Sequence, residues 1–403
     1  MLKNRFQLPL LVFGGIAVVK ALVFFYDLVP LALSFYVIFA GAFVCAGQVG
    51  SGALKKNPQG FSKAAVLTVC MFFFAGISVI LQNLLIDDRI DNDSRSALWF
   101  STTTYLLAAI YFLIGAGLHG ARFEKSNSLA LLFLGILVAG IYINLDGLPV
   151  LNFGQMSLQR SDEVQIDHLV IGEPAIFLVA LALAFSGRKL RGVLFAVGLM
   201  CFFCMGGRTA LISYAASVLV FFLIRQSARR NAVVVGLAAI LILLAWAQIS
   251  VYSDDPLVAR MLISDGLEAD ESQIARNQIF SDGLSNLFQQ SFIGDPTLIV
   301  EKSGTIGAYF HNLLSAWQFF GMIPFLATLF AIIYITAHIW KGRERLTSRA
   351  DDFGVFLFFY CVISVVIGKA VNFYPFWLSL GFWLYRIQMS GFNKALNRVV
   401  VQG

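Results

Sequence analysis

Long apolar runs separated by short polar segments extend along almost the whole chain of 403 residues. Twelve such runs lie at 7–26, 29–47, 64–85, 98–118, 128–144, 169–186, 192–206, 209–224, 232–252, 313–338, 353–371 and 374–388. About 20 apolar residues cross the hydrocarbon core of a bilayer as a helix, which satisfies its own backbone hydrogen bonds in lipid. The pattern therefore predicts an all-α polytopic membrane protein of about 12 transmembrane helices, with residues 1–403 forming a single membrane domain.

Two polar segments are much longer than the other connections, and they lie at about 145–168 and 253–309. The longer one separates the ninth predicted helix from the tenth. Within it, residues recur at the spacing of one helix face, namely Arg276, Phe280, Leu284, Leu287 and Phe288. We therefore expect a helix that lies on the membrane surface inside this loop.

Composition and charge sharpen this architecture. Hydrophobic residues make up 59% of the chain and charged residues 13%, whereas charged residues make up about a quarter of a soluble domain. The connections that share a side with both termini hold twenty basic and four acidic residues, and the opposite connections hold eight basic and nineteen acidic ones. Since basic residues are retained in the cytoplasm, both termini are predicted to be cytoplasmic and both long loops to face outward. This distribution, and not a nucleic-acid partner, explains the net charge of +6.

Three arginines on the predicted outer side are candidate anion ligands. Arg276 shares the apolar face of its helix, Arg208 follows two glycines between two apolar runs, and Arg160 precedes two acidic residues. A guanidinium binds phosphate oxygens through paired hydrogen bonds and stays charged when partly desolvated. The alternatives are a structural salt bridge for Arg276, an interfacial anchor for Arg208 and an exposed ion pair for Arg160.

His311 opens the tenth predicted helix on the outer side, within YFHNLLSAWQFF. His311, Ser315 and Gln318 recur at helical spacing and form a polar stripe on an otherwise apolar segment. Such a stripe predicts a cavity or a partner helix, and the alternative is a histidine that only caps or packs.

Two further ionisable residues, Glu173 and Lys369, lie at predicted outer helix ends. Charged groups are costly in a membrane and often line a functional cavity, although either residue could equally be half of a buried ion pair. The five cysteines all fall in apolar runs, where core packing explains them. No metal site or disulfide is therefore expected.

Three local patterns carry a resemblance to a known family. They are GGRTALISYAASVLVFF, ARNQIFSDGLSNLFQQSFIGDP and HNLLSAWQFFGMIPFL. In this order and with a twelve-span topology, they resemble the superfamily of O-antigen polymerases and ligases, the Wzy and WaaL proteins. The chain keeps the loop arginine and the His-Asn pair of that pattern, but departs from it at Gly207, Gln318 and Gly294.

The resemblance implies a GT-C-like glycosyltransferase in the bacterial cytoplasmic (inner) membrane, with its active site facing the periplasm. It would polymerise undecaprenyl-diphosphate-linked repeat units of O-antigen or a related surface polysaccharide, with inversion and without a metal or another cofactor. Carried over by motif, Arg208 and Arg276 would bind the lipid diphosphate, and Arg160 fits this role less securely. His311 would act on the acceptor hydroxyl, which makes His311 and Arg276 the expected catalytic residues, with Asn312 as a secondary candidate.

The expected partners are the lipid-linked glycan donor and acceptor, membrane lipids and a chain-length regulator protein, with no nucleic acid. Three alternatives stay open. An O-antigen ligase shares the donor chemistry but attaches the glycan to lipid A-core. A transporter would show helices broken near the bilayer midplane and related halves, and a non-catalytic scaffold would tolerate loss of His311 or Arg276.

Overall fold

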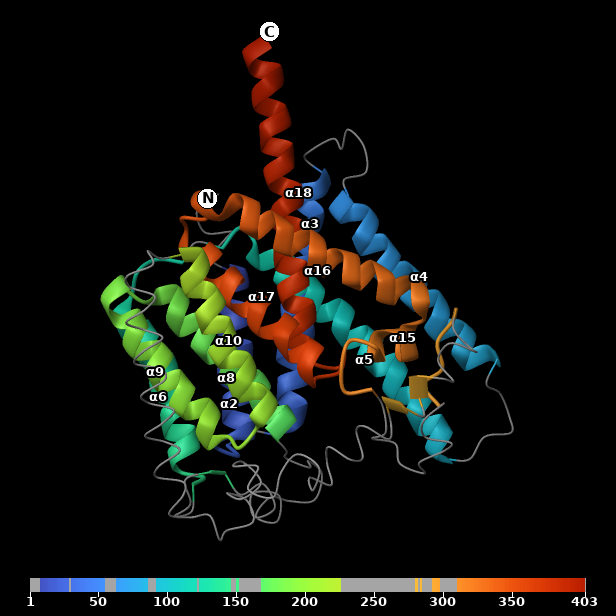
Figure 1. The fold of residues 1–403 in the computed structure, drawn as a ribbon, viewed down its shortest axis with the longest axis horizontal. Coiled ribbons are helices and arrows are strands. Elements are labelled where there is room, and N and C mark those ends of the chain that lie inside the picture. Colours follow the sequence, from blue (N-terminus) through green and yellow to red (C-terminus); the bar gives the residue numbers. More distant parts are fainter. Residues whose placement is uncertain are drawn as a thin grey trace. The chain divides into compact units, whose positions relative to one another are not determined.

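The computed structural model describes residues 8–28, 30–54, 63–85, 92–121, 123–145, 150–151, 168–225, 280–281, 283–284, 292–297 and 310–402. Within these ranges the regular structure consists of helices alone (Figure 1). They are α2 (Leu8–Phe24), α3 (Leu31–Leu54), α4 (Lys63–Leu85), α5 (Asn92–Leu118), α6 (Asn127–Tyr142), α8 (His168–Phe185), α9 (Arg188–Cys204), α10 (Arg208–Arg225), α15 (Ser315–Phe320), α16 (Met322–Gly342), the short 3-10 helix η2 (Arg343–Arg345), α17 (Arg349–Ile367) and α18 (Tyr374–Gln402). The prediction of an all-α fold is confirmed for this part of the chain.

Eleven of the twelve predicted runs fall on described residues, and each of them is helical. The run 232–252 lies outside the described residues. The structure differs from the predicted runs in several places: the run 313–338 is divided into α15 and α16, and α18 continues to Gln402. In addition, α3 extends to Leu54 and α5 begins at Asn92. Of the expected surface helix in the long loop, residues 280, 281, 283 and 284 are described and helical.

Five of the described helices are long and apolar enough to cross a membrane. They are Lys63–Leu84, Ser96–Leu118, Arg208–Arg225, Met322–Arg345 and Arg349–Ile367. Large apolar side chains are exposed on such helices, as Phe73, Ile80 and Leu84 are on α4, and lipid is the solvent in which this exposure costs nothing. The structure thus supports an α-helical membrane protein, and the number of twelve spans stays a prediction.

The chain divides into two units, each built from three separate stretches. The first unit comprises Met1–Gly41, Ala121–Asp270 and Gly342–Ser364, and the second comprises Ala42–Gly120, Glu271–Lys341 and Val365–Gly403. Each unit is described by itself below, and the single membrane domain stays a prediction.

Helix α8 lies at the centre of the first unit. It packs against α2, α6 and α9, and every side chain from residue 171 to residue 185 is buried. A helix surrounded by protein on all sides is expected to be apolar all round, and the α8 sequence HLVIGEPAIFLVALALAF contains a single carboxylate, Glu173.

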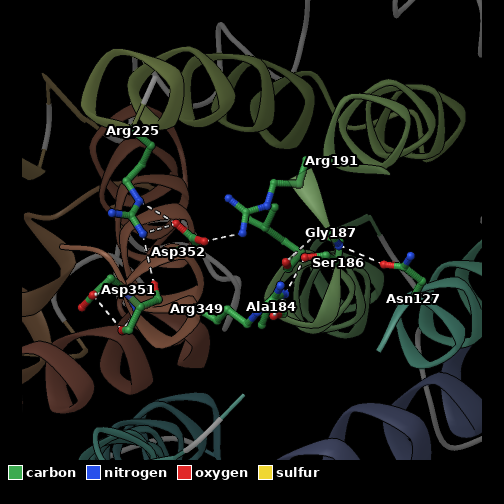
Figure 2. A network of polar contacts seen from close by, with 11 residues as sticks. Asn127, Ala184, Ser186, Gly187, Arg191, Arg225, Arg349, Asp351 and Asp352 are labelled. Atoms are coloured by element: carbon green, nitrogen blue, oxygen red, sulfur yellow. Dashed lines mark hydrogen bonds and ion pairs between the residues drawn. The ribbon is translucent and has the colours of Figure 1, made fainter. Parts of the chain in front are cut away.

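At one end of this unit, Asp352 joins three helices (Figure 2). It lies in the first turn of α17 and is buried. Arg191 of α9 donates to its Oδ2 at 2.5 Å, and Nε of Arg225, at the end of α10, donates to its Oδ1 at 2.5 Å. Arg225 also donates to the carbonyl oxygen of Ser348 at 3.1 Å. One carboxylate therefore fixes the ends of α9 and α10 against the start of α17.

Arg349 ties the same region to α8 (Figure 2). Its Nη1 donates to the carbonyl oxygens of Ala184 at 3.2 Å and Ser186 at 2.5 Å, so a cation satisfies the carbonyls at the C-terminus of α8. The start of α17 is capped in turn, because Ser348 N donates to Asp351 Oδ2 and Asp351 N donates to Ser348 Oγ.

In the second unit, α5 and α18 approach each other closely through two glycines. A Cβ added to Gly115 would overlap the carbonyl oxygen of Leu378, and one added to Gly381 would overlap that of Phe112. Small residues let membrane helices come into backbone contact and gain packing energy that lipid tails alone do not provide. The pair forms the most extensive helix contact in this unit.

Contacts between helix ends agree with the predicted alternation of sides. Leu151 N, in the first outer loop, donates to the carbonyl oxygen of Cys204 at the predicted outer end of α9. Arg386 donates to the carbonyl oxygen of His119, and both lie at predicted cytoplasmic ends. These contacts support the topology, while the identity of the cytoplasmic side stays a prediction.

Candidate functional site

The predicted site residues are divided between the two units. Arg208 and Glu173 belong to the first unit, and the segments carrying His311 with Asn312 and Lys369 belong to the second. Arg160 and Arg276 lie outside the described residues. The predicted convergence of the arginines with His311 therefore stays a prediction, and each local arrangement is described separately.

The His311 segment is a turn that leads into α15. Asn312 Oδ1 accepts a hydrogen bond from Leu314 N at 2.9 Å, and the Asn312 carbonyl accepts one from Ser315 Oγ at 2.6 Å. This side-chain-to-backbone turn shapes the chain before the helix. His311 itself is half-buried. The predicted helix opening is thus a capped turn, with α15 beginning at Ser315.

The other two members of the predicted polar stripe, Ser315 and Gln318, are fully buried. Ser315 Oγ accepts from Val371 N at 2.9 Å, and Gln318 Oε1 accepts from Phe310 N at 3.1 Å. These two side chains of the stripe therefore bond to the backbone of non-helical segments at Val371 and Phe310, where a cavity or a partner helix was expected. Gln318 Nε2 is buried without a hydrogen-bond partner among the described residues, so the segment retains one unused donor.

The helix that was predicted to run through 313–338 is broken at Gly321. This residue has φ +89° and ψ 173°, a conformation that essentially only glycine adopts. A Cβ at this position would overlap the carbonyl oxygen of Phe292. Met322 N would bond to Gln318 O in a continuous helix, and it donates instead to Phe292 O at 3.3 Å. The loop segment thus supplies an acceptor for one backbone N–H group at the helix break.

A second glycine, Gly294, fits against this break from the loop side. It has φ +79°, and an added Cβ would lie 2.6 Å from the carbonyl oxygen of Trp317 and 2.7 Å from Gly321 N. The turn continues with Asp295 Oδ1, which accepts from the backbone N of Thr297 at 2.8 Å and from its hydroxyl at 2.7 Å. Gly294 and Gly321 thus form a joint between the long loop and the helix that follows His311.

Gln82 of α4 completes this joint. Its Nε2 donates to the carbonyl oxygens of Ile293 and Phe319, each at 3.0 Å. Phe319 O would accept from residue 323 in a continuous helix, so the side-chain amide satisfies a carbonyl that the break leaves open. Ser101 Oγ lies 3.4 Å from the same oxygen. Sequence analysis missed Gln82, although a polar residue near the end of an apolar run is a usable signal.

Lys369 lies in the turn between α17 and α18, beside the α15 segment. It is buried, and its Nζ lies 5.4 Å from the centroid of the Phe373 ring, within reach of a cation–π interaction. The hydrogen bond from Val371 N to Ser315 Oγ joins this turn to α15. The turn that carries Lys369 and the segment that carries His311 therefore belong to one locally connected region.

Arg208 is placed as the sequence predicted, at a tight reversal between two helices. α9 ends at Cys204, Gly206 has φ +67°, and α10 begins at Arg208. The side chain is half-buried. Because Leu151 N bonds to Cys204 O, the beginning of the first long loop lies at the same reversal. The predicted anion ligand therefore lies where two connections that are predicted to be on the outer side meet.

Glu173 is half of a buried ion pair, one of the two alternatives that the sequence left open. Its Oε2 lies 2.7 Å from Nζ of Lys20 on α2, and both side chains are about one-tenth exposed. The second oxygen, Oε1, is buried without a hydrogen-bond partner among the described residues. The pair joins α2 to α8, which favours a structural role for Glu173.

Breaking this pair should destabilise the protein. Lys20→Ala or Glu173→Ala should each cost about 3–5 kcal/mol, because either change leaves an uncompensated buried charge. Thermal unfolding of the purified protein in detergent measures the loss. The double variant Lys20→Met/Glu173→Leu should recover much of the stability of the parent protein. Additive losses in the double variant would contradict a direct pairing.

The described residues offer no ready-made metal site. No group of three or more His, Cys, Asp or Glu side chains in this part of the chain is close enough to hold a metal ion. The five cysteines are free, and Cys45, Cys201 and Cys361 are buried, which agrees with the expected core packing.

Comparison of the chain with models of known protein families found no match, and comparison with curated proteins found none.

Proposed function

We propose that the protein is a membrane glycosyltransferase that polymerises undecaprenyl-diphosphate-linked repeat units on the periplasmic face. One observation carries the proposal most strongly. Two of the three sequence patterns that resemble O-antigen polymerases meet at the Gly294–Gly321 joint. The joint connects the loop that contains Arg276 to the helix that follows His311, which supports a shared active site for the two residues.

The chemistry assigns distinct tasks to these residues. Transfer breaks the bond between C1 of the donor sugar and the lipid diphosphate, and negative charge develops on the leaving diphosphate. Arg208 and Arg276, with Arg160, would stabilise this charge through fixed guanidinium groups. His311 would accept or orient the proton of the attacking hydroxyl. Attack opposite the leaving group inverts the anomeric centre. A GT-C-like membrane cavity that holds both substrates would bring the attacking hydroxyl close to the sugar.

Asn312 and Lys369 have supporting tasks in this proposal. The Asn312 side chain closes the turn that presents His311. Lys369 supplies a buried positive charge next to the α15 segment, which would favour the bound diphosphate. Glu173 is not needed for the transfer, because Lys20 already engages it.

One observation favours a second candidate, a transporter. Broken helices create binding sites in transporters, and the break between α15 and α16 is of this kind. In this chain, however, the freed backbone groups Phe319 O and Met322 N are already occupied by Gln82 and Phe292. The break therefore serves to position a loop, and polymerisation remains the better-supported function.

The test is an assay of the purified protein in vesicles that contain lipid-linked repeat units. Elongation of these units without any other acceptor is the expected result. A strict requirement for lipid A-core would identify a ligase instead. Movement of the lipid-linked unit across the vesicle membrane without formation of a new glycosidic bond would identify a transporter and refute the proposal.

A further inference from the structure

Five arginines line one cavity in the first unit. The cavity has a volume of about 860 Å³, and its basic lining residues are Arg188, Arg191, Arg225, Arg343 and Arg349. They come from α9, the end of α10, η2 and the start of α17. All of them belong to connections predicted to be cytoplasmic, so the cavity is separate from the periplasmic site proposed above.

The charge of the lining is unbalanced. Among the described lining residues, two carboxylates, Glu344 and Asp352, accompany the five arginines, so these seven side chains together carry a formal charge of +3. Asp352 is already engaged by both Arg191 and Arg225 (Figure 2). Like charges gathered in a concave surface repel one another. A bound anion would relieve this repulsion.

Part of the lining is held in place before any ligand arrives. Asp352 fixes the guanidinium groups of Arg191 and Arg225, and the carbonyl oxygens of Ala184 and Ser186 fix that of Arg349. Arg191 is buried, and its Nε has no hydrogen-bond partner among the described residues. A buried donor without a partner is costly, and Arg191 tolerates this cost while Asp352 holds its guanidinium group beside the cavity.

Retention of basic residues in the cytoplasm does not explain this arrangement. Cytoplasmic retention depends only on positive charge in the connections, and lysine provides that charge as well as arginine does. Lys189 and Lys341 lie close by in the sequence, yet all the basic side chains that the structure describes in the lining are arginines. Arginine is the residue whose planar, forked donors match the oxygens of a phosphate group.

We infer that this cavity is a binding site for a phosphate group, on the face of the membrane opposite to the proposed glycan transfer. The group could belong to a free phosphate-bearing ion or to the headgroup of an anionic phospholipid, and the chemistry of recognition is the same. The volume lies within the range of small-molecule pockets, about 300–1,000 Å³.

A charge-matched pair of double variants tests this site. Arg188→Gln/Arg343→Gln removes two exposed lining arginines, whereas Lys189→Gln/Arg345→Gln removes two exposed neighbours that do not line the cavity. Neither variant disturbs the Asp352 network, so both should fold.

In one arm, inorganic phosphate is titrated into the detergent-solubilised protein against chloride at matched ionic strength, and the thermal unfolding midpoint is recorded. In the other arm, native mass spectrometry compares retention of phosphatidylglycerol with that of phosphatidylcholine.

The lining variant should weaken phosphate or phosphatidylglycerol binding by at least about tenfold, since each hydrogen bond to a charged group contributes about 1.5–3 kcal/mol. The control variant should bind like the parent protein. If the lining variant loses binding of inorganic phosphate, the ligand is a free ion. If it loses only binding of phosphatidylglycerol, the ligand is a lipid headgroup. Equal behaviour of the two variants, or a parent protein that binds neither probe, would overturn the inference.

Discussion

Replacing His311 with alanine should lower the rate of glycan transfer by about 10²–10⁴-fold, the usual contribution of a positioned acid or base. The loss should appear mainly in kcat, because His311 is proposed to act on the attacking hydroxyl and not to hold the donor. His311 is half-buried, and the fully buried residues of its segment are Ser315 and Gln318. The variant should therefore insert and unfold like the parent protein.

His338→Ala is the matched control. His338 lies in α16, which follows the His311 segment directly, and its predicted position at the opposite, cytoplasmic end leaves it far from the proposed chemistry. Transfer by this variant should be unchanged, as measured by incorporation of labelled repeat units into polymer. Arg276→Ala should lower transfer by about 10²–10³-fold through loss of charge stabilisation on the diphosphate. Full activity of both His311→Ala and Arg276→Ala would refute the site assignment.

Gly321→Ala should disrupt the joint between the long loop and α15. The conformation of Gly321 alone makes a side chain cost about 1–3 kcal/mol. The added Cβ would also overlap Phe292 O and lie 2.9 Å from the carbonyl carbon of Ile293, and both are backbone atoms that cannot simply rotate away. We expect a total cost above the upper end of that range and a loss of transfer activity.

Gly342→Ala provides the control for this prediction. Gly342 ends α16, has φ −94°, and no heavy atom lies within 4 Å of the position of its Cβ. Its replacement should leave both the thermal unfolding midpoint and the transfer rate unchanged. An unfolding midpoint for Gly321→Ala that equals that of Gly342→Ala would show that the joint does not constrain the fold.

The sequence predicted the helices well because lipid imposes a simple rule. A run of apolar residues long enough to cross the membrane has to be helical, whatever surrounds it. The position of Arg208 after a glycine-rich reversal was predicted for a similar reason, since Gly206 and Gly207 mark a local turn. Residues adjacent in the sequence determine each of these features, so the features could be predicted without knowledge of how the helices pack.

The break at Gly321 could not be read in this way. The residues around it are apolar enough to continue the helix, and the conformation is selected by Phe292, which is distant in sequence. The pairing of Glu173 with Lys20 likewise depends on the packing of α2 against α8. The arginine-lined cavity depends on three connections meeting at one end of a unit. Charge counts placed its arginines on one side of the membrane, but only their positions in space reveal a concave site.

Gln82 also has a consequence for the biogenesis of the protein. The ribosome completes α4 long before it reaches α15, and domains form in the order of synthesis. We therefore expect the Gln82 side-chain amide, which donates to Phe319 O and Ile293 O, to be inserted before the broken helix is synthesised. When the later segment enters the membrane, the Phe319 carbonyl that the helix break leaves open can accept a hydrogen bond from Gln82 at once. The order of synthesis thus shortens the time for which this peptide group lacks a partner.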